Sequence, residues 1–322
     1  MKYRSICMLG GSGFVGGHLA ARLASDGVDV KILTRNAERS KHLTVLPTVK
    51  LVQGDCHDPA VLEREFQGMD AVINLVGILN EKGHKGEGFR RAHVELTRKV
   101  LDACQQTGVR RLLHMSSLNA DGGGPSHYLR TRGEAESLVH IYSRLGLQAT
   151  IFQPSTIFGE GDSSINRFAG LLRLMPIFPL ACPHSRMAPV HVGDVVEAFH
   201  RSLQDRNTIG RRYQLCGPDV MTLKEIVSYT ARVMGKRRLI IGLPDFLSRL
   251  QANVMEFFPG KPFSRDNYHS LLVDSVCMEN GLAELGITAT AMDAVVPRFL
   301  GGRNSRDRFA EMRRQAKRGK ES

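Results

Sequence analysis

The stretch "MLGGSGFVGGHLA", residues 8–20, follows a short apolar segment and begins a run with helical periodicity. Gly11, Gly13 and Gly16 satisfy the pattern G-x-G-x-x-G, while Gly10, Gly13 and Gly16 satisfy G-x-x-G-x-x-G. Glycines at these spacings permit a tight turn and let the backbone approach a pyrophosphate, which the following helix N-terminus binds. Because the loop lies between a strand and an amphipathic helix, it predicts a dinucleotide site.

Strands and helices alternate along the chain on the C-terminal side of this loop. Strands are expected at residues 5–9, 28–33, 49–53, 71–76, 111–115 and 148–153. Helices are expected between them at residues 14–25, 59–66, 87–106 and 128–145. This alternation predicts βαβ units with right-handed crossovers. The expected fold class is therefore α/β, with a doubly wound parallel sheet of the Rossmann type.

The pattern loosens after residue 153, where proline and glycine accumulate and the elements become short. We expect a Rossmann domain at 1–155 with a returning segment at about 188–216. A smaller C-terminal substrate or partner domain is expected at 156–187 and 217–302, and a basic tail at 303–322. Within the smaller domain, Thr222 with Glu225 three residues later predicts a capped helix.

A second helix of the smaller domain is expected over residues 246–258, with an apolar face. The members of that face are Leu247, Leu250, Val254, Phe257 and Phe258. Such a face more often packs into a core than onto a membrane or a partner. Core packing is therefore our expectation.

Composition limits the class of protein. The chain has 322 residues, of which 42% are hydrophobic and 24% charged, as in soluble globular proteins. The longest apolar run, at 168–182, is interrupted by Arg173, Pro176 and Pro179, so it does not predict a membrane span. The basic and apolar N-terminus is explained by the glycine loop, so we do not expect a signal peptide.

The six cysteines are scattered without a CxxC pair, which predicts reduced and mostly buried thiols in a cytoplasmic protein. The 12 histidines show no metal-ligand spacing, so no metal site is expected.

The net charge is +12, and residues 303–322 carry +5 of it, with 8 basic and 3 acidic residues. A solvated tail is the favoured interpretation. Contact with anionic lipid headgroups or an acidic partner is the alternative, which would place the protein at the inner face of the membrane. No nucleic-acid partner is expected, because no basic motif is interleaved with aromatic residues.

Residues at the ends of the second to fourth strands indicate which dinucleotide binds. An NAD(H) site calls for an acidic residue about 20 positions after the glycines. Arg35 stands there instead, 19 residues after Gly16. A guanidinium suits a 2′-phosphate, so NADP(H) is expected in preference to NAD(H). Asp55 and Cys56 are expected beside the adenine.

These motifs resemble those of a known family. Their order is similar to that in extended and atypical short-chain dehydrogenases/reductases. It runs from GGSGFVG through GD at 54–55, NLVG at 74–77 and SS at 116–117 to Tyr128 with a cation four residues later. Later stretches, including "PVHVGDVVEA" and "YQLCGPDVMTLKEI", resemble the branch that contains the nucleotide-binding accessory subunit of respiratory complex I and its bacterial relatives. The resemblance implies a Rossmann fold, tight NADP(H) binding and, in many relatives, no catalysis. Some relatives are linked to quinone metabolism.

The resemblance also assigns roles to individual residues. Ser116 or Ser117 would hold the substrate oxygen, and Tyr128 would be the acid/base. Arg132 occupies the position of the family's lysine, whose charge favours the ionised tyrosine and which contacts the nicotinamide ribose. The remaining cofactor contacts would come from Gly10, Gly11, Ser12, Gly13, Phe14, Val15, Gly16, Leu75, Val76, Gly77 and Pro154.

Two departures from the family weaken the catalytic expectation. Arg132 is planar and permanently protonated, so it does not relay a proton as an amine does. Four-residue spacing puts Tyr128 and Arg132 on one helix face, but Arg132 can equally pair with Glu136. Gln153 stands before Pro154 where the family more often has arginine, which argues against a phosphorylated or nucleotide-linked substrate.

Two functions remain open at this level. The first is an NADP(H)-dependent oxidoreductase or epimerase-like enzyme acting on a carbonyl or quinone-related small molecule. The second is a non-catalytic nucleotide-binding protein of a respiratory or quinone-synthesis complex. The glycine-rich loop at 79–89 is either a lid over the substrate or an ordinary surface loop.

Overall fold

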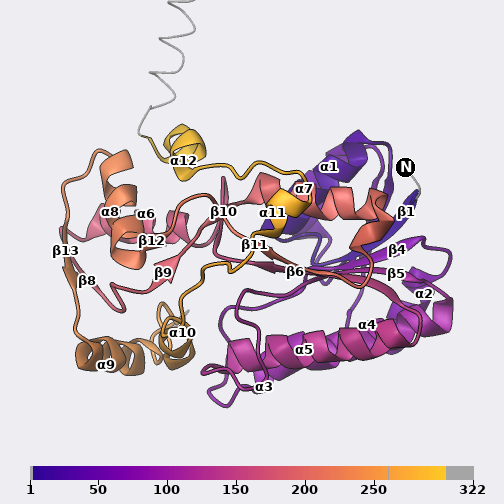
Figure 1. The fold of residues 1–322 in the computed structure, drawn as a ribbon, viewed down its shortest axis with the longest axis horizontal. Coiled ribbons are helices and arrows are strands. Elements are labelled where there is room, and N and C mark those ends of the chain that lie inside the picture. Colours follow the sequence, from indigo (N-terminus) through magenta and orange to yellow (C-terminus); the bar gives the residue numbers. More distant parts are fainter. Residues whose placement is uncertain (1–2, 260, 302–322) are drawn as a thin grey trace, which may run out of the picture.

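The computed structural model describes residues 3–259 and 261–301, and the predicted basic tail at 303–322 lies outside them. Seven parallel strands form one sheet in the order β11-β6-β5-β4-β1-β2-β3 (Figure 1). Their bounds are β1 Ser5–Leu9, β2 Asp29–Thr34, β3 Val49–Gln53, β4 Ala71–Asn74, β5 Arg111–Met115, β6 Gln148–Pro154 and β11 Arg212–Leu215. The doubly wound parallel sheet predicted from the sequence is confirmed.

Helices cover both faces of this sheet, as Figure 1 shows. One face packs against α1 (Phe14–Ser25) and α7 (Val192–Gln204). The other packs against α2 (Pro59–Phe66), α4 (Leu96–Thr107) and α5 (His127–Arg144). Strand periodicity produces the two cores, since Ile6 and Met8 of β1 belong to one cluster and Cys7 and Leu9 to the other.

Several short helices connect these layers. A four-residue helix, α3 (Glu87–Arg90), continues through a π-helical turn, η2 (Arg91–Glu95), into α4. Two 3₁₀ helices, η1 (Glu38–Val45) and η3 (Arg206–Thr208), lie in loops next to the sheet. A π turn inside an α-helix is uncommon and often marks a functional site.

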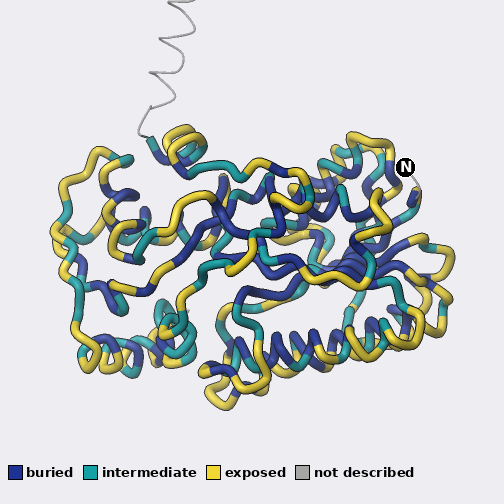
Figure 2. The backbone as a smooth tube through the Cα atoms, in the orientation of Figure 1, coloured by how far each residue is buried: buried dark blue, intermediate teal, exposed yellow. Residues whose placement is uncertain are grey.

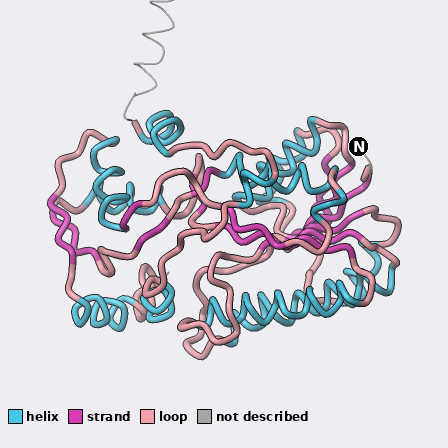
Figure 3. The backbone as a smooth tube through the Cα atoms, viewed as in Figure 1, coloured by secondary structure: helices cyan, strands magenta, loops and turns pink. Residues whose placement is uncertain are grey.

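Much of the chain after β6 forms a smaller lobe of short elements joined by long loops, while α7 and β11 return to the sheet (Figure 3). The helices of this lobe are α6 Ile165–Leu174, α8 Leu223–Val233, α9 Asp245–Met255, α10 Arg265–Ser270 and α12 Met292–Leu300, whereas α11 Gly281–Glu284 packs on β11 of the sheet. Its strands are β7 Ile157–Phe158, β8 Ile177–Leu180, β9 Arg186–Met187, β10 Val190–His191, β12 Met221–Thr222 and β13 Leu239–Gly242, which form two-stranded pairs. Two apolar clusters that involve α6, α8 and α12 stabilise this lobe.

The predicted cap of α8 is confirmed. The Thr222 hydroxyl accepts the Glu225 N–H at 3.2 Å, and the Glu225 carboxylate accepts the Thr222 N–H at 2.7 Å. Both bonds satisfy N–H groups that a helix start otherwise leaves unpaired.

The expectation of core packing for the apolar face of α9 is wrong. Leu250, Val254, Phe257 and Phe258 are all more than half exposed. The buried residues of the helix are Ser248 and Ala252, so α9 packs through its small side chains. Figure 2 shows how burial changes between buried, intermediate and exposed positions along the turns of this helix. No helix within 3–259 and 261–301 combines the length and apolarity that a membrane span requires.

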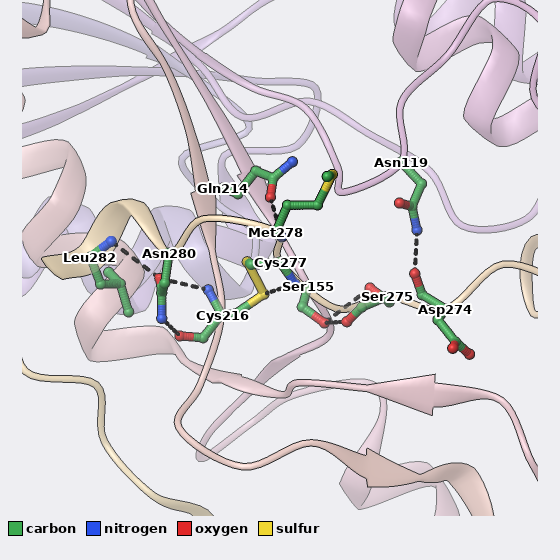
Figure 4. The surroundings of a disulfide bond; sticks show 10 residues. All are labelled: Asn119, Ser155, Gln214, Cys216, Asp274, Ser275, Cys277, Met278, Asn280 and Leu282. Carbon is green, nitrogen blue, oxygen red and sulfur yellow. Dashed lines mark hydrogen bonds between the residues drawn. A yellow bond between two sulfur atoms is a disulfide. The ribbon is translucent and has the colours of Figure 1, made fainter. Parts of the chain in front are cut away.

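The expectation that all six cysteines are reduced is also wrong. Cys216, just after β11, forms a disulfide with Cys277, from which it is separated by 61 positions (Figure 4). Periodicity did not reveal the pair, because the segment before α11 returns to the sheet edge through a long irregular path. Cys7, Cys56, Cys104 and Cys182 are free.

Candidate functional site

The glycine loop lies between β1 and α1, with its backbone exposed to a cavity. Gly10 has a φ of +75°, and the Gly13 N–H closes the turn onto the Gly10 carbonyl at 3.0 Å. A Cβ at Gly16 would lie 2.5 Å from the Gly11 Cα, so the loop and helix approach too closely for any side chain there. No side chain caps α1, which leaves the N–H groups of its first turn free for an anion.

The expected adenosine side of the site lies at the carboxyl ends of β2 and β3. Arg35 is exposed directly after β2, and its charge opposes the burial that raises the pKa of the Cys56 thiol. Asp55 accepts the His57 N–H at 2.9 Å, and Ser12 accepts the Thr34 hydroxyl at 3.4 Å. These groups are adjacent to the loop but do not line the cavity described below, and neither do Gly11 and Val76.

The carboxyl ends of β4 and β5 carry the next group of expected residues. Leu75, Gly77, Ser116 and Ser117 all line the cavity. The Ser117 hydroxyl is buried and has no hydrogen-bond partner within the described residues. Buried polar atoms are normally paired, so such an atom fits a site where a ligand supplies the partner.

Tyr128 lies in the first turn of α5, and both lobes position that turn. The Ser126 hydroxyl accepts the Leu129 N–H at 3.1 Å. Asp266 of α10 accepts the N–H groups of His127 and Tyr128 at 2.6 and 3.1 Å. The start of α5 is therefore tied to the smaller lobe, and nothing in the sequence pattern indicated Asp266.

His93, in the π-helical turn η2, positions Tyr128 from the other side. Its Nε2 accepts the Ile78 N–H at 3.2 Å, so the neutral ring carries its proton on Nδ1, 2.9 Å from the Thr131 hydroxyl. That hydroxyl donates to the His127 and Tyr128 carbonyls. Burial, reinforced by the charge of Arg132, lowers the pKa of His93 to about 2, so the ring stays neutral.

Two aromatic rings hold the Tyr128 side chain. His93 and Phe89 both pack edge-on, with ring centroids 5.5 and 6.0 Å from that of Tyr128. The Tyr128 hydroxyl has no hydrogen-bond partner in the described part of the chain, while the side chain lines the cavity. His93 was missed at the sequence level, although its spacing of four from Phe89 puts both residues on one helix face.

Arg132 is buried, and backbone atoms fix its guanidinium. Nη1 donates to the Met115 carbonyl at 2.9 Å and to the Val76 carbonyl at 3.4 Å, which ties α5 to the ends of β5 and β4. Its Cζ lies 5.5 Å from the centre of the Tyr128 ring, and its Nε is buried with no partner among the described residues. The alternative pairing of Arg132 with Glu136 is wrong, because the two strand-end carbonyls bind the guanidinium instead.

Glu136 pairs with Gln153, which stands in the place of the family's arginine. The Gln153 amide donates to the Glu136 carboxylate at 2.8 Å, and both side chains are buried. Burial raises the pKa of Glu136, while the hydrogen bond from Gln153 opposes that shift. The amide therefore serves an internal bond, and neither side chain lines the cavity.

One continuous cavity of about 730 Å³ joins these groups. It begins at the loop residues Gly10, Gly13, Phe14, Val15 and Gly16, continues past Tyr128, Arg132 and Pro154, and extends into the smaller lobe. The loop at 79–89 borders it through Leu79 and Asn80. This loop also contacts the smaller lobe, since His84 lies 2.8 Å from Glu256.

The cradle fits a dinucleotide. Glycine backbone without side chains surrounds the start of α1, where no side chain caps the N–H groups that an anion could bind. Farther along the same cavity lies the Ser117 hydroxyl, which has no partner among the described residues. Fold and site together define a dinucleotide-binding protein of the doubly wound α/β class.

Residues 6–216 match the NAD dependent epimerase/dehydratase family, and the chain belongs to that family. The resemblance to extended short-chain dehydrogenases/reductases is thereby confirmed, and the family is one of NAD(P)-dependent oxidoreductase-like enzymes.

The relatives of this chain include both a respiratory-complex subunit and a reductase. The 40 kDa subunit of NADH-ubiquinone oxidoreductase from Neurospora crassa is 28% identical over 251 residues, which cover 77% of this chain and 65% of that subunit. The chain thus spans less than two thirds of that relative. A ceramide reductase from Caulobacter vibrioides is 30% identical over 247 residues, 74% of each protein.

Solved structures show the same fold. DesIV, a dTDP-glucose 4,6-dehydratase from Streptomyces venezuelae with NAD and TYD bound, superposes with a TM-score of 0.72 over 92% of this chain and 95% of that one, at 19% identity. MoeE5 in complex with UDP-glucose and NAD gives a TM-score of 0.70 at 20% identity, over 92% and 96% of the chains.

Proposed function

We propose that the protein is an NADP(H)-dependent reductase of a carbonyl or quinone-related small molecule, with Tyr128 as its acid. The observation that carries this proposal is the continuous cavity, which runs from the start of α1 past Tyr128 into the smaller lobe. A cofactor bound along the loop and a substrate in the second lobe would meet beside Tyr128. The name of the Caulobacter relative, a ceramide reductase, agrees with reduction.

The preference for NADP(H) rests on Arg35. This exposed arginine follows β2, where an NAD-selective site has an acidic residue. A 2′-phosphate would accept bidentate, charge-assisted hydrogen bonds from it. Asp55 and Cys56, at the end of the neighbouring strand, would border the adenine.

When bound, the cofactor supplies a hydride. The protein's own groups do the rest: Ser117 or Ser116 would hold the substrate oxygen, and the Tyr128 hydroxyl would donate a proton to it. Arg132 would act by its charge, which is fixed 5.5 Å from the Tyr128 ring. Because its Nη1 already bonds two carbonyls, Arg132 would not relay the proton.

A second candidate is a nucleotide-binding assembly protein without turnover. The observation that favours it is the same guanidinium, which holds the ends of β4 and β5 together as a structural cross-brace. Relatives from Neurospora crassa and Arabidopsis thaliana are named as subunits of mitochondrial NADH dehydrogenase. Residues 303–322 would then provide a contact with an acidic partner or an anionic membrane surface.

The test begins with the nucleotide that co-purifies and its redox state. NADPH oxidation is then followed with carbonyl and quinone compounds in wild type, Tyr128→Phe and Tyr142→Phe. Tyr142 is the matched control, because it lies on the same helix and its hydroxyl bonds Asp102 outside the cavity. We expect a loss of at least roughly tenfold only for Tyr128→Phe.

Equal turnover in the two tyrosine variants would remove Tyr128 from the mechanism. Bound NADPH that is never oxidised, with an association lost on deleting 303–322, would favour the assembly role. Arg35→Asp should weaken NADPH relative to NADH, and unchanged selectivity would contradict the role of Arg35.

A further inference from the structure

The half of the cavity in the smaller lobe has an apolar wall. This wall is formed by side chains of α6, β8, β9, α8 and the end of α10. Its main residues are Phe168, Leu171, Phe178, Met187, Leu223 and Leu271. These side chains are the inner surface of the apolar cluster that stabilises the lobe. A rigid apolar wall of this kind gains free energy by excluding water from a hydrocarbon.

Charged groups are few around the same cavity. Within the described residues its lining contains no carboxylate and two arginines, Arg132 and Arg167. Arg132 belongs to the strand ends beside Tyr128. Arg167 is exposed and donates to the carbonyls of Lys261 and Pro262, so the backbone already satisfies part of its guanidinium. Phosphate groups are usually held by several cations, and among the described residues Arg167 is the one cation that lines this half.

We infer that this half of the cavity takes a long unbranched or isoprenoid-type hydrocarbon chain, so that the substrate is a neutral lipid-like carbonyl compound. The inference rests on the proposed function for the position of the carbonyl, which would lie beside Tyr128 and Ser117. The chain would then extend between α6 and α10 towards Met255 of α9, which lines the far part of the wall.

The experiment measures binding separately from turnover. Straight-chain ketones that differ by one methylene are titrated into the protein saturated with NADP⁺, and the affinity is read by calorimetry. Burying each methylene should strengthen binding by about fourfold until the wall is filled. Leu171→Asp should weaken the longest ketone roughly tenfold or more. Leu174→Asp is the matched control, because it lies on the same helix, is 82% exposed and is outside the cavity.

The two proposals fail in different ways. Affinity that rises with chain length without NADPH oxidation supports the chain pocket and argues against reduction. Turnover of short ketones with no dependence on length, or equal effects of the two aspartates, would overturn the chain pocket and leave the reductase intact.

A second and independent observation concerns the outer face of α9. Five apolar side chains at helical spacing, each 51–77% exposed, form a stripe on this face: Phe246, Leu250, Val254, Phe257 and Phe258. The opposite face buries Ser248 and Ala252 against the smaller lobe. Five large apolar side chains on one exposed helix and its C-terminal turn are more than a monomeric surface normally carries.

Cations flank this apolar stripe. Arg249 lies within the helix, and Lys82 and Lys85 lie in the exposed loop whose His84 ring is 5.7 Å from that of Phe257. Two carboxylates lie near the stripe among the described residues: Asp245, which accepts the Tyr268 hydroxyl, and Glu256, which pairs with Arg265, Lys261 and His84. An apolar helix face with basic neighbours is complementary to an anionic lipid surface, where the apolar residues enter the acyl boundary and the cations meet headgroups.

We propose that α9 docks the protein on an anionic lipid bilayer. The other face of α9 borders the cavity through Gln251 and Met255, so docking would bring the apolar pocket next to the membrane. This step concerns the helix alone and does not involve residues 303–322.

The test is co-sedimentation of the full chain with vesicles of phosphatidylcholine, with and without phosphatidylglycerol. Binding should require phosphatidylglycerol, and the pair Phe246→Ser with Phe257→Ser should reduce partitioning at least roughly tenfold. Leu145→Ser, directly after α5, is the control, since Leu145 is as exposed as Phe246, at 69%. Unchanged binding of the double variant would overturn the role of α9. A dimer of the wild type that the double variant dissociates, without vesicle binding, would also overturn it and make the stripe a protein interface.

Discussion

Gly77 is the position where the smallest substitution gives the most direct test of the site. A Cβ at residue 77 would lie 2.9 Å from Cζ of Arg132 and closer still to its Nη2. The φ angle of Gly77 is outside the left-handed region, so the backbone itself accepts alanine. In Gly77→Ala the guanidinium must therefore move, and it then loses its hydrogen bonds to the carbonyls of Met115 and Val76.

The size of the effect follows from those bonds. A hydrogen bond from a charged donor contributes about 1.5–3 kcal/mol, and here the acceptor carbonyl of Met115 also loses its partner in a buried site. We expect Gly77→Ala to lower the free energy of unfolding by about 2 kcal/mol, roughly a thirtyfold change in the folding equilibrium.

Urea unfolding of four proteins measures this: wild type, Gly77→Ala, Arg132→Lys and the double variant. Lysine has no Nη2, so Gly77→Ala should cost less than about 0.5 kcal/mol in the Arg132→Lys background. Gly122→Ala is the control, since a methyl there meets nothing within 4 Å. The same cost in both backgrounds would refute the contact between residue 77 and the guanidinium.

Three further predictions concern stability. Burial raises the pKa of Glu136 above 4.5, so between the pKa of the unfolded chain and that of the folded protein only the folded protein keeps the proton. The stability of the folded protein therefore falls as pH rises from the lower of these two pKa values to the higher. Glu136→Gln should therefore gain stability relative to wild type as pH increases above 4.5 in urea titrations, and a difference independent of pH would contradict this. Replacing Cys216 and Cys277 by serine should cost about 2–4 kcal/mol, because their disulfide closes a long loop, and a wild-type melting temperature that is insensitive to reductant would refute it. Thr222→Ala should cost about 1 kcal/mol through the lost cap while Thr222→Ser retains it, as thermal unfolding can show.

The sheet was predictable because its determinants are local. Short apolar strands, a glycine loop and regular alternation with helices fix a parallel doubly wound fold within a few residues of the observed bounds. The glycine positions predicted the cofactor loop for a similar local reason, since Gly16 lies so close to the loop backbone that it has no room for a side chain.

The catalytic side was less predictable because its contacts are distant in sequence. Asp266 binds the start of α5 across 138 positions, and no periodicity connects the two. Spacing of four gave Arg132 two neighbours on its helix, Tyr128 and Glu136, but the carbonyls that bind its guanidinium come from β4 and β5. Helix geometry shows which side chains lie on one face and does not show which acceptors tertiary packing brings to that face.

The α9 error has a different origin. The apolar period of residues 246–258 was identified correctly, but the spacing of apolar residues shows only that they share one side of a helix and does not show what that side contacts. In the folded protein, the small residues Ser248 and Ala252 permit the closer approach, and the apolar face points outward.

The π-helical turn η2 sets the relative phase of the two ends of the helix from Glu87 to Thr107. By sequence spacing, Phe89, His93, Leu96 and Val100 would form one continuous stripe on a regular α-helix. The wider turn separates them, so that the first two rings face Tyr128 and the later residues join the core beneath the sheet. A π turn takes up one residue more than an α turn, so winding the same residues into a regular α-helix would rotate the first two by roughly 100° relative to the others. Deleting one residue within 91–95, in contrast, would restore the regular pitch and keep both ends of the helix near their present phase. The extra residue of this turn thus keeps the two rings directed at the tyrosine while the later residues stay in the core, with no change in the chemical character of the helix.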